Sequence, residues 1–163
     1  GKRKAVTASG RTTGGRPSRN ILNEQQVIRF LQRFIKDRGL NLSVYVYHGQ
    51  EHTIAATSRV FLSARVIIGV HGANMANIIF ANPDKGTSVI EIVGAEPFEK
   101  YGHYVSYHYR GWASSLDYML IPKHLSLPSV PGQRTAEMVR MSDLERALQW
   151  ALFKQTTDSS CSV

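Results

Sequence analysis

The sequence predicts an α/β fold, with an open, mostly parallel sheet and helices on both of its faces. Patterns typical of strands and of helices alternate along the chain, which favours right-handed β-α-β units. Two of the strand patterns, VIIGV at residues 66–70 and SVIEIV at residues 88–93, are short and almost continuously apolar. Such runs are expected of parallel strands that helices cover on both sides.

The composition indicates one domain with a hydrophobic core of its own. The chain has 163 residues, of which 42% are hydrophobic and 20% charged. A chain of this size buries about 70% of the surface that it exposes when unfolded, so its core needs neither a disulfide nor a structural metal. Cys161 is the single cysteine, which excludes an intramolecular disulfide and a Cys/His zinc site. We expect one domain over residues 1–155 and a loose polar tail over residues 156–163.

The chain begins with a short strand and a well-marked helix. We predict the strand over residues 4–7 and, after it, a loop rich in Gly, Thr and Arg at residues 11–19. Asn23 is a favourable N-cap, and Gln26 follows it at the spacing of a capping box. Four apolar side chains then fall on one helix face, namely Val27, Phe30, Leu31 and Phe34. Gly39 suits the left-handed residue that often ends a helix.

The middle of the chain alternates between strands and short helices. We predict strands over residues 42–47, 66–70 and 88–93, and helices over residues 54–64 and 74–80. Thr53 is the expected cap of the first of these two helices. We expect Ile54, Ser58, Phe61 and Leu62 to lie on one side of this helix.

The last third of the chain is less regular. Residues 98–109 are rich in tyrosine and fit no single pattern. A last strand is predicted over residues 116–121, followed by a loop over residues 122–132 that contains three prolines. Ser142 and Glu145 have the spacing of a capping box at the start of a C-terminal helix. The apolar side chains of that helix are Leu144, Leu148, Ala151 and Leu152.

The positive charge is concentrated at the start of the chain. The formal net charge is +8, and the first twenty residues hold six basic side chains and no acidic one. A basic segment suits a nucleic acid, and it suits a small anionic ligand equally well. A non-catalytic basic module that binds nucleic acid or nucleotides is therefore one hypothesis. No RNP, KH or zinc-finger motif accompanies the basic residues, and our first expectation is that the chain has no nucleic-acid partner.

One turn of the sequence lies where ligands commonly bind. In an open α/β sheet, ligands bind beyond the carboxyl ends of the strands, and the turn at residues 69–74 (GVHGAN) follows such an end. Gly72 would let a ligand approach the backbone, the next helix begins with partial positive charge, and His71 is able to donate a hydrogen bond to a phosphate. An equally open alternative is a tight turn that His71 merely caps.

Two further features could bind an anionic ligand. Glu91 lies among apolar neighbours, and a buried carboxylate needs partners. Two ribose hydroxyls would serve, and so would a nearby arginine, which is the commoner arrangement. Arg11, Arg16 and Arg19 could close over a phosphate with bidentate guanidinium groups, or they could form an ordinary solvated loop.

Together, four segments in this order resemble glycosyltransferase family 61. The segments are Arg11 with RNILNE at 19–24, ARVIIGVHGA at 64–73, Asn77 with IIF at 78–80, and SVIEI at 88–92. The resemblance extends from residue 11 to residue 121. It implies a Rossmann-like fold, as one lobe of a two-lobed GT-B glycosyltransferase, namely the C-terminal lobe that binds the nucleotide sugar.

The resemblance also implies which residues bind the donor. The residues that match the family pattern are Arg11, Arg19, His71, Gly72, Ala73, Asn77 and Glu91. The implied roles place the arginines and His71 around the diphosphate and Glu91 on the ribose. His71 is also the only candidate for a catalytic residue that accepts the proton of the acceptor hydroxyl. No DxD-like pair occurs in the sequence, and we expect transfer without a metal or another cofactor.

The sequence departs from the family pattern at two places. Asn74 stands where members usually have glycine, which makes the turn bulkier and would affect the choice of sugar. Ala56 and Thr57 stand where the preceding helix commonly carries Glu-Gln. The resemblance further implies an N-terminal partner lobe, and an N-terminal anchor as the only membrane contact. We identify neither here and expect this chain to be an inactive fragment by itself.

The expected activity is transfer of a sugar, with inversion, from a nucleotide-sugar donor to a hydroxyl of a glycoprotein or polysaccharide. The donor is expected to be UDP-linked, carrying GlcNAc or a pentose, and the resemblance implies the lumen of the Golgi or endoplasmic reticulum. The sequon at Asn41 is compatible with that location. An α/β-hydrolase is a weaker alternative, because VIIGVHG resembles an oxyanion-hole strand but no G-x-S-x-G nucleophile elbow occurs.

Overall fold

The protein is built around a five-stranded parallel sheet. The computed structural model describes residues 3–9, 21–49, 52–94, 115–126 and 136–153. The strands of the sheet are β1 (Arg3–Ser9), β2 (Leu42–His48), β3 (Ala64–Val70), β4 (Ser88–Val93) and β5 (Asp117–Pro122). Their order across the sheet is β2-β1-β3-β4-β5, and each neighbouring pair is parallel.

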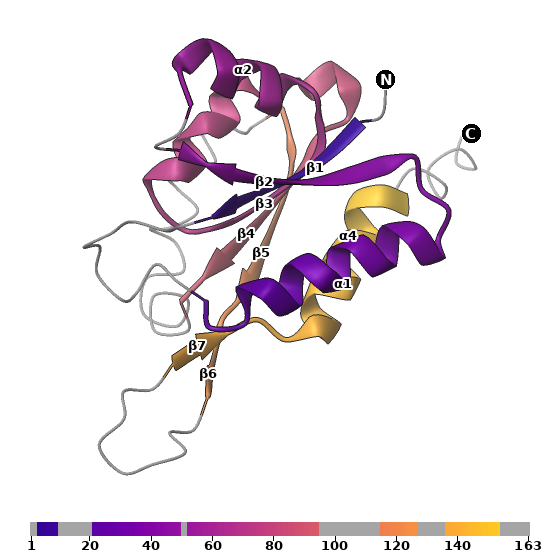
Figure 1. The fold of residues 1–163 in the computed structure, drawn as a ribbon, viewed down its shortest axis with the longest axis vertical. Coiled ribbons are helices and arrows are strands. Elements are labelled where there is room, and N and C mark those ends of the chain that lie inside the picture. The colour runs from indigo at the N-terminus through magenta and orange to yellow at the C-terminus, as the bar shows by residue number, and fades with distance from the viewer. Residues whose placement is uncertain (1–2, 10–20, 50–51, 95–114, 127–135, 154–163) are drawn as a thin grey trace, which may run out of the picture.

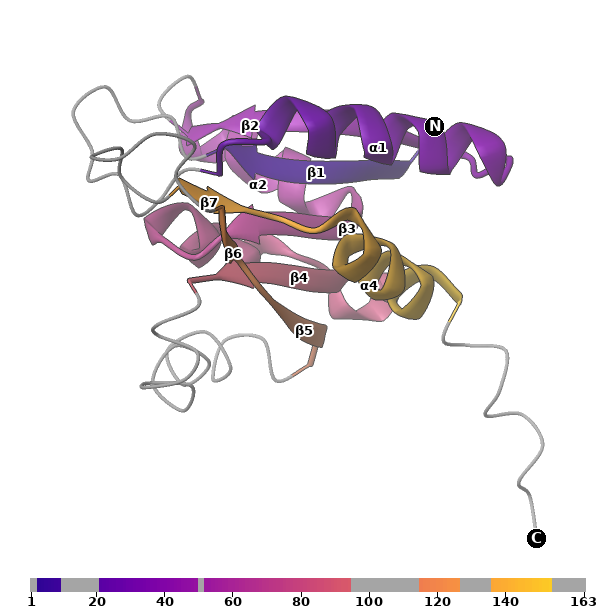
Figure 2. The same ribbon diagram turned by 90° about the horizontal axis from the view of Figure 1, so that it is seen from below.

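Helices cover both faces of this sheet. The helices α1 (Glu24–Asp37) and α4 (Met141–Phe153) pack on one face, and α2 (Ile54–Leu62) and the 3-10 helix η3 (Ala73–Phe80) pack on the other (Figure 1). On the first face, α1 contacts β2, and α4 contacts β4 and β5 (Figure 2). A hydrophobic core lies on each face of the sheet, and strand β4 contributes to both. Ile90 and Ile92 point to α1 and α4, while Val89 points to α2 and η3. The predicted Rossmann-like α/β fold is confirmed.

The strand order defines where a ligand is expected. The chain runs from β1 outward to β2 and then returns to β3 on the other side of β1. The direction of winding therefore reverses between β1 and β3, and in doubly wound sheets ligands bind at the carboxyl ends of the strands at this switch point. Strand β3 ends at Val70, directly before His71.

Helix α1 has the predicted apolar face but not the predicted cap. Val27, Leu31 and Phe34 are buried, and Gly39 takes a φ of 59° just after the helix, as expected of a left-handed end. Asn23 occupies the N-cap position, yet its side chain makes no capping hydrogen bond. The predicted capping box is therefore wrong, since the carboxamide of Asn23 has a partner elsewhere in the chain.

Helix α2 begins as predicted and buries a different side. Thr53 caps it by accepting a hydrogen bond from the backbone N–H of Ala56 at 3.3 Å. Its buried residues are Thr57, Val60 and Phe61. Ile54, which is 78% exposed, and Leu62, also exposed, lie on the solvent side while Phe61 is buried, so the prediction that they share one side with Phe61 is wrong. The helix ends at Leu62 because β3 already begins at Ala64.

The chain adds a small antiparallel ribbon after the main sheet. Strands β6 (His124–Ser126) and β7 (Ala136–Met138) pair with each other, so the predicted loop over residues 122–132 is wrong where β6 lies. Helix α4 begins at Met141, one residue before the predicted cap. The side chain of Glu145 accepts from Arg38, the residue after α1, at 3.4 Å instead of bonding to the start of its own helix, so this capping box is also wrong.

Several predicted features lie outside the described residues. These are the arginine-containing loop at residues 11–19, the tyrosine-rich residues 98–109 and the tail over residues 156–163. Within the described ranges, no helix combines the length and the apolar character needed to cross a lipid bilayer.

Candidate functional site

The turn that carries His71 is fixed to the end of the sheet. The backbone N–H of His71 donates to the carbonyl of Ile92 on β4 at 2.8 Å, which continues the β3–β4 ladder by one step. Gly72 is extended, with a φ of 161°, and its carbonyl accepts from the N–H of Met75 at 2.9 Å. Met75, in the first turn of η3, is completely buried. The turn at residues 71–73 is therefore held at both ends, by a strand and by a packed helix.

His71 and Glu91 form a close pair at this turn. Nδ1 of His71 lies 2.7 Å from Oε1 of Glu91. The glutamate is 0% exposed, whereas the imidazole keeps 40% of its surface accessible. Glu91 stands beside Gly69 in the parallel register of β3 and β4. Because Gly69 has no side chain, the carboxylate has room at this place in the sheet to reach the imidazole.

A tyrosine that the sequence did not single out completes the pair. The hydroxyl of Tyr118, on β5, donates to Oε2 of Glu91, so both carboxylate oxygens have partners. A buried carboxylate is tolerated only when its oxygens are hydrogen-bonded, and these two donors satisfy that requirement. The alternative of an arginine partner for Glu91 is not what the described residues show. Tyr118 lies in a predicted strand, but only the pairing of β4 with β5 reveals that it faces Glu91.

The contact with the carboxylate favours one tautomer of His71. An ionised carboxylate can only accept, so opposite it Nδ1 of His71 would be the donor and the lone pair of the neutral ring would lie on Nε2. A histidine held in this way can take a proton at Nε2 or, when protonated, donate a hydrogen bond to an anionic oxygen. The imidazole is therefore hydrogen-bonded to a buried carboxylate, a contact that the capping of a turn would not need.

The asparagines of the turn have distinct places. Nδ2 of Asn77 donates to the backbone carbonyl of Asn74 at 3.0 Å, which braces the start of η3 directly after Ala73. The side chain of Asn74 lies against Gly49 at the end of β2, where an added Cβ would come within 2.7 Å of Oδ1 of Asn74. The bulk that Asn74 introduces is therefore accommodated because residue 49 is glycine.

The two positions that depart from the family pattern on α2 have structural partners. The hydroxyl of Thr57 is 2.9 Å from that of Tyr47, and this buried contact ties α2 to β2. The backbone of Ala56 takes part in the cap of the helix. Of the predicted donor-binding residues, the structure pairs His71 with Glu91, places Gly72 and Ala73 in the same turn, and places Asn77 on η3, bonded to the backbone of Asn74. Arg11 and Arg19 lie outside the described residues, and their place near this cluster stays a prediction.

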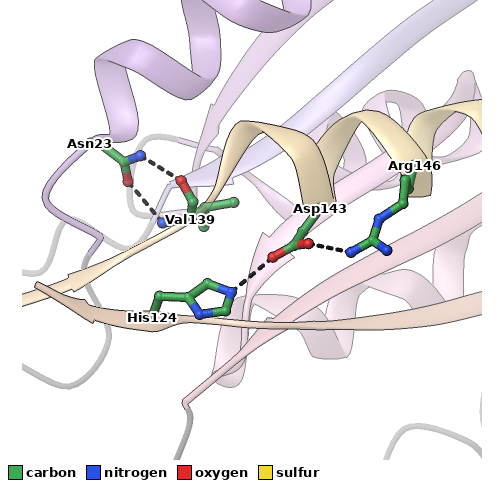
Figure 3. Close-up of polar contacts among 5 residues, drawn as sticks. All are labelled: Asn23, His124, Val139, Asp143 and Arg146. Atoms are coloured by element: carbon green, nitrogen blue, oxygen red, sulfur yellow. Dashed lines mark hydrogen bonds and ion pairs between the residues drawn. The ribbon is translucent and has the colours of Figure 1, made fainter.

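A second pairing of a histidine with a carboxylate lies where β6 meets α4. Nε2 of His124 is 2.8 Å from Oδ2 of Asp143, and Arg146 donates to Oδ1 of Asp143 at 2.5 Å (Figure 3). Burial raises the pKa of Asp143, but the hydrogen bonds from Arg146 and His124, and their charges, outweigh burial and hold it below its usual 3.8. This cluster joins the ribbon to the first turn of α4.

Comparison with known proteins yields one family. The family model described as Glycosyltransferase 61 matches residues 3–90, a span that begins with β1 and includes the turn at residues 71–73. No curated protein matches the chain.

Proposed function

The chain belongs to glycosyltransferase family 61, and from this premise we propose that it binds the nucleoside diphosphate of a sugar donor at the turn formed by His71, Gly72 and Ala73. The enzyme is a glycosyltransferase. The proposed reaction moves a sugar, with inversion, from a UDP-linked donor carrying GlcNAc or a pentose to a hydroxyl of a glycoprotein or polysaccharide. This chain would supply the donor-binding lobe of a two-lobed GT-B enzyme.

The hydrogen bond between His71 and Glu91 carries the proposal. It holds the imidazole at the carboxyl end of β3, which is one side of the switch point of the sheet. With Nδ1 directed to the carboxylate, Nε2 would be the ring atom that meets the donor. A protonated imidazole at this place would donate to a phosphate oxygen as the bond between sugar and diphosphate breaks, when negative charge develops on the leaving group.

The turn and the arginines would complete the diphosphate site. The backbone at Gly72 and Ala73 leads into η3, whose first peptide groups bring partial positive charge. Arg11 and Arg19 follow β1, the other strand of the switch point, and would add bidentate contacts to the phosphates. Asn77 would act by bracing the backbone carbonyl of Asn74 and so keeping the turn in shape.

Asn74 would influence which sugar the enzyme accepts. Its side chain fills space between η3 and the end of β2 that a glycine would leave open. We expect Asn74→Gly to change the relative affinity for UDP-linked sugars of different size while leaving the affinity for UDP unchanged. Calorimetric titration with UDP, UDP-GlcNAc and a UDP-pentose would measure both quantities.

The cellular setting is proposed from the family. Members act in the secretory pathway, and the sequon residue Asn41 is exposed at the start of β2, where a lumenal protein could be glycosylated. A partner lobe and an N-terminal anchor would belong to the same enzyme. Activity would then require the partner lobe, and UDP binding is the property to measure first.

Calorimetric titration of the chain with UDP tests the proposal. We expect His71→Ala to weaken UDP binding about tenfold, as for the loss of one hydrogen bond to a charged group. The matched control is His124→Ala, which removes a histidine that is paired with a carboxylate elsewhere and should leave the affinity unchanged. Equal UDP affinity for the wild type and His71→Ala would contradict a role on the diphosphate.

Two other outcomes point to different functions. Intact UDP affinity with lost transfer in His71→Ala would indicate that His71 is the base for the acceptor hydroxyl. Binding of random DNA with a steep salt dependence, together with no UDP binding, would favour the basic nucleic-acid module, because phosphate contacts release counterions.

A further inference from the structure

We propose that Glu91 and Tyr118 are positioning residues that act through His71, and that Glu91 does not contact the ribose of the donor. This inference rests on the proposed function only in taking His71 as the group that meets the donor. It differs from the role on the ribose that the family resemblance implies for Glu91.

The surroundings of Glu91 leave no place for a sugar hydroxyl. The side chain is 0% exposed, and its two oxygens are bonded to Nδ1 of His71 and to the hydroxyl of Tyr118. A ribose contact would require the carboxylate to give up one of these donors and to become accessible from outside. The same carboxylate needs no change at all to orient an imidazole.

Three neighbouring strands position the cluster. His71 follows β3, Glu91 belongs to β4 and Tyr118 belongs to β5. In the parallel register, Glu91 is paired with Leu120, and Tyr118 lies two residues earlier on the same face of β5. The tyrosine therefore reaches Glu91 diagonally, and its place depends on a pairing between segments that are far apart in the sequence.

Tyr118 affects His71 through the carboxylate. Its hydroxyl occupies Oε2 of Glu91 and so leaves Oε1 to the imidazole. Without that hydroxyl, a buried oxygen loses its donor, and the carboxylate is free to rotate or to draw His71 into another orientation. Both changes alter where Nε2 points and how often Nδ1 carries the proton. Tyr118 therefore has a defined effect on the atom that meets the donor, although it touches no ligand itself.

Nitrogen NMR of His71 tests this directly and needs no ligand. We expect the wild-type chain to show one tautomer, with the proton on Nδ1, and Tyr118→Phe to show a mixture. The matched control is Tyr45→Phe, which removes a hydroxyl bonded to a different histidine, His52, at 3.2 Å, and should leave the His71 signals unchanged. An unchanged single tautomer in Tyr118→Phe would overturn the proposal.

A second measurement separates positioning from ribose binding. Glu91→Gln keeps the shape of the side chain but offers one acceptor oxygen to two donors. We expect it to weaken binding of UDP and of 2′,3′-dideoxy-UDP by the same factor, about threefold, which is less than the loss from His71→Ala. If Glu91 bound the ribose, the loss would appear with UDP and vanish with the dideoxy nucleotide, and this result would overturn the proposal.

The two hypotheses fail in different ways. If His71→Ala binds UDP like the wild type, the proposed function fails, but the tautomer of His71 in Tyr118→Phe still reports whether the tyrosine positions the ring. If His71→Ala loses affinity and Tyr118→Phe changes neither tautomer nor affinity, the proposed function stands and the positioning role is wrong.

Discussion

The carboxamide of Asn23 binds both backbone groups of Val139. Nδ2 of Asn23 donates to the carbonyl of Val139 at 2.7 Å, and Oδ1 accepts from its N–H at 3.0 Å (Figure 3). The contact is buried and joins residues that are 116 positions apart. It fastens the start of α1 to the segment between β7 and α4, in the way that a neighbouring strand would bond. The side chain therefore cannot also cap its own helix.

Asn23→Ala should destabilise the fold by about 2 kcal/mol, because it leaves the buried N–H and carbonyl of Val139 without their partner. Urea unfolding, read as a change of midpoint at constant slope, measures this. The control is Asn41→Ala, at an exposed position, which should change the stability by less than about 0.5 kcal/mol. Equal midpoints for the two variants would show that the contact does not stabilise the fold.

Met75→Ala should loosen the turn of His71 as well as the core. Met75 is a residue of η3 with 0% exposure, and its truncation should cost about 3 kcal/mol, as for other buried methionines. Because η3 then packs less firmly on the sheet, hydrogen exchange at the backbone N–H of His71 should also be faster. Ile79→Ala, on the same helix at 62% exposure, should change neither quantity. Equal loss of stability in both variants would contradict the role of Met75 as an anchor.

The fold should be less stable in acid, because Asp143 then loses the charge that its partners stabilise. Burial raises its pKa, but the hydrogen bonds and charges of Arg146 and His124 hold the pKa in the folded chain below the usual 3.8. The contribution of the Asp143 carboxylate to the free energy of unfolding is therefore complete at neutral pH. It is lost as the pH falls below about 4, through the folded pKa. It should stay below about 1 kcal/mol, because Arg146 is 78% exposed.

Asp143→Asn supplies the comparison for this pH effect. Thermal midpoints of the wild type and the variant should differ most near pH 7 and approach each other towards about pH 3. A difference that is constant over this range, or that grows in acid, would show that the carboxylate does not stabilise the fold through its charge.

Gly49→Ala and Gly39→Ala should have opposite effects. A Cβ at residue 49 would lie 2.7 Å from Oδ1 of Asn74, so the variant should displace that side chain and change the relative affinity for UDP-linked sugars of different size, with little loss of stability. At residue 39, nothing lies within 4 Å of the new Cβ, but the φ of 59° disfavours alanine. That variant should lose about 1 kcal/mol of stability and keep its UDP affinity. Calorimetry with UDP-GlcNAc and a UDP-pentose, together with urea unfolding, tests the contrast, which an unchanged relative affinity for the two sugars in Gly49→Ala would remove.

Much of the fold could be predicted because its signals are local. The apolar face of α1 is complete within the helix itself, and the strand predicted over residues 88–93 has the bounds of β4. The turn at residues 71–73 could be placed at a carboxyl end because a strand pattern directly precedes it. The buried side of α2 could not be found in this way. Thr57 contacts Tyr47 and Ile54 is exposed because of how the helix lies on β2, which the helix sequence does not specify.

The candidate site was predicted in part. His71 and Glu91 were chosen separately, one for its turn and the other as a carboxylate among apolar residues, and the structure joins them with one hydrogen bond. Tyr118 was missed because nothing near it in the sequence distinguishes it from other tyrosines. The register between β4 and β5 gives it its role.

The sequence by itself determined the succession of the strands of the main sheet and the helices between them, and the turn that carries His71, because periodicity and turn chemistry act over a few residues. Only the tertiary structure decided which partner each polar side chain takes. A carboxamide or carboxylate has several possible partners, and the one it takes is the one that the packing of the folded chain brings within hydrogen-bond distance. For Asn23 this is the backbone of Val139, and for Glu91 it is the pair of donors from β5 and the end of β3.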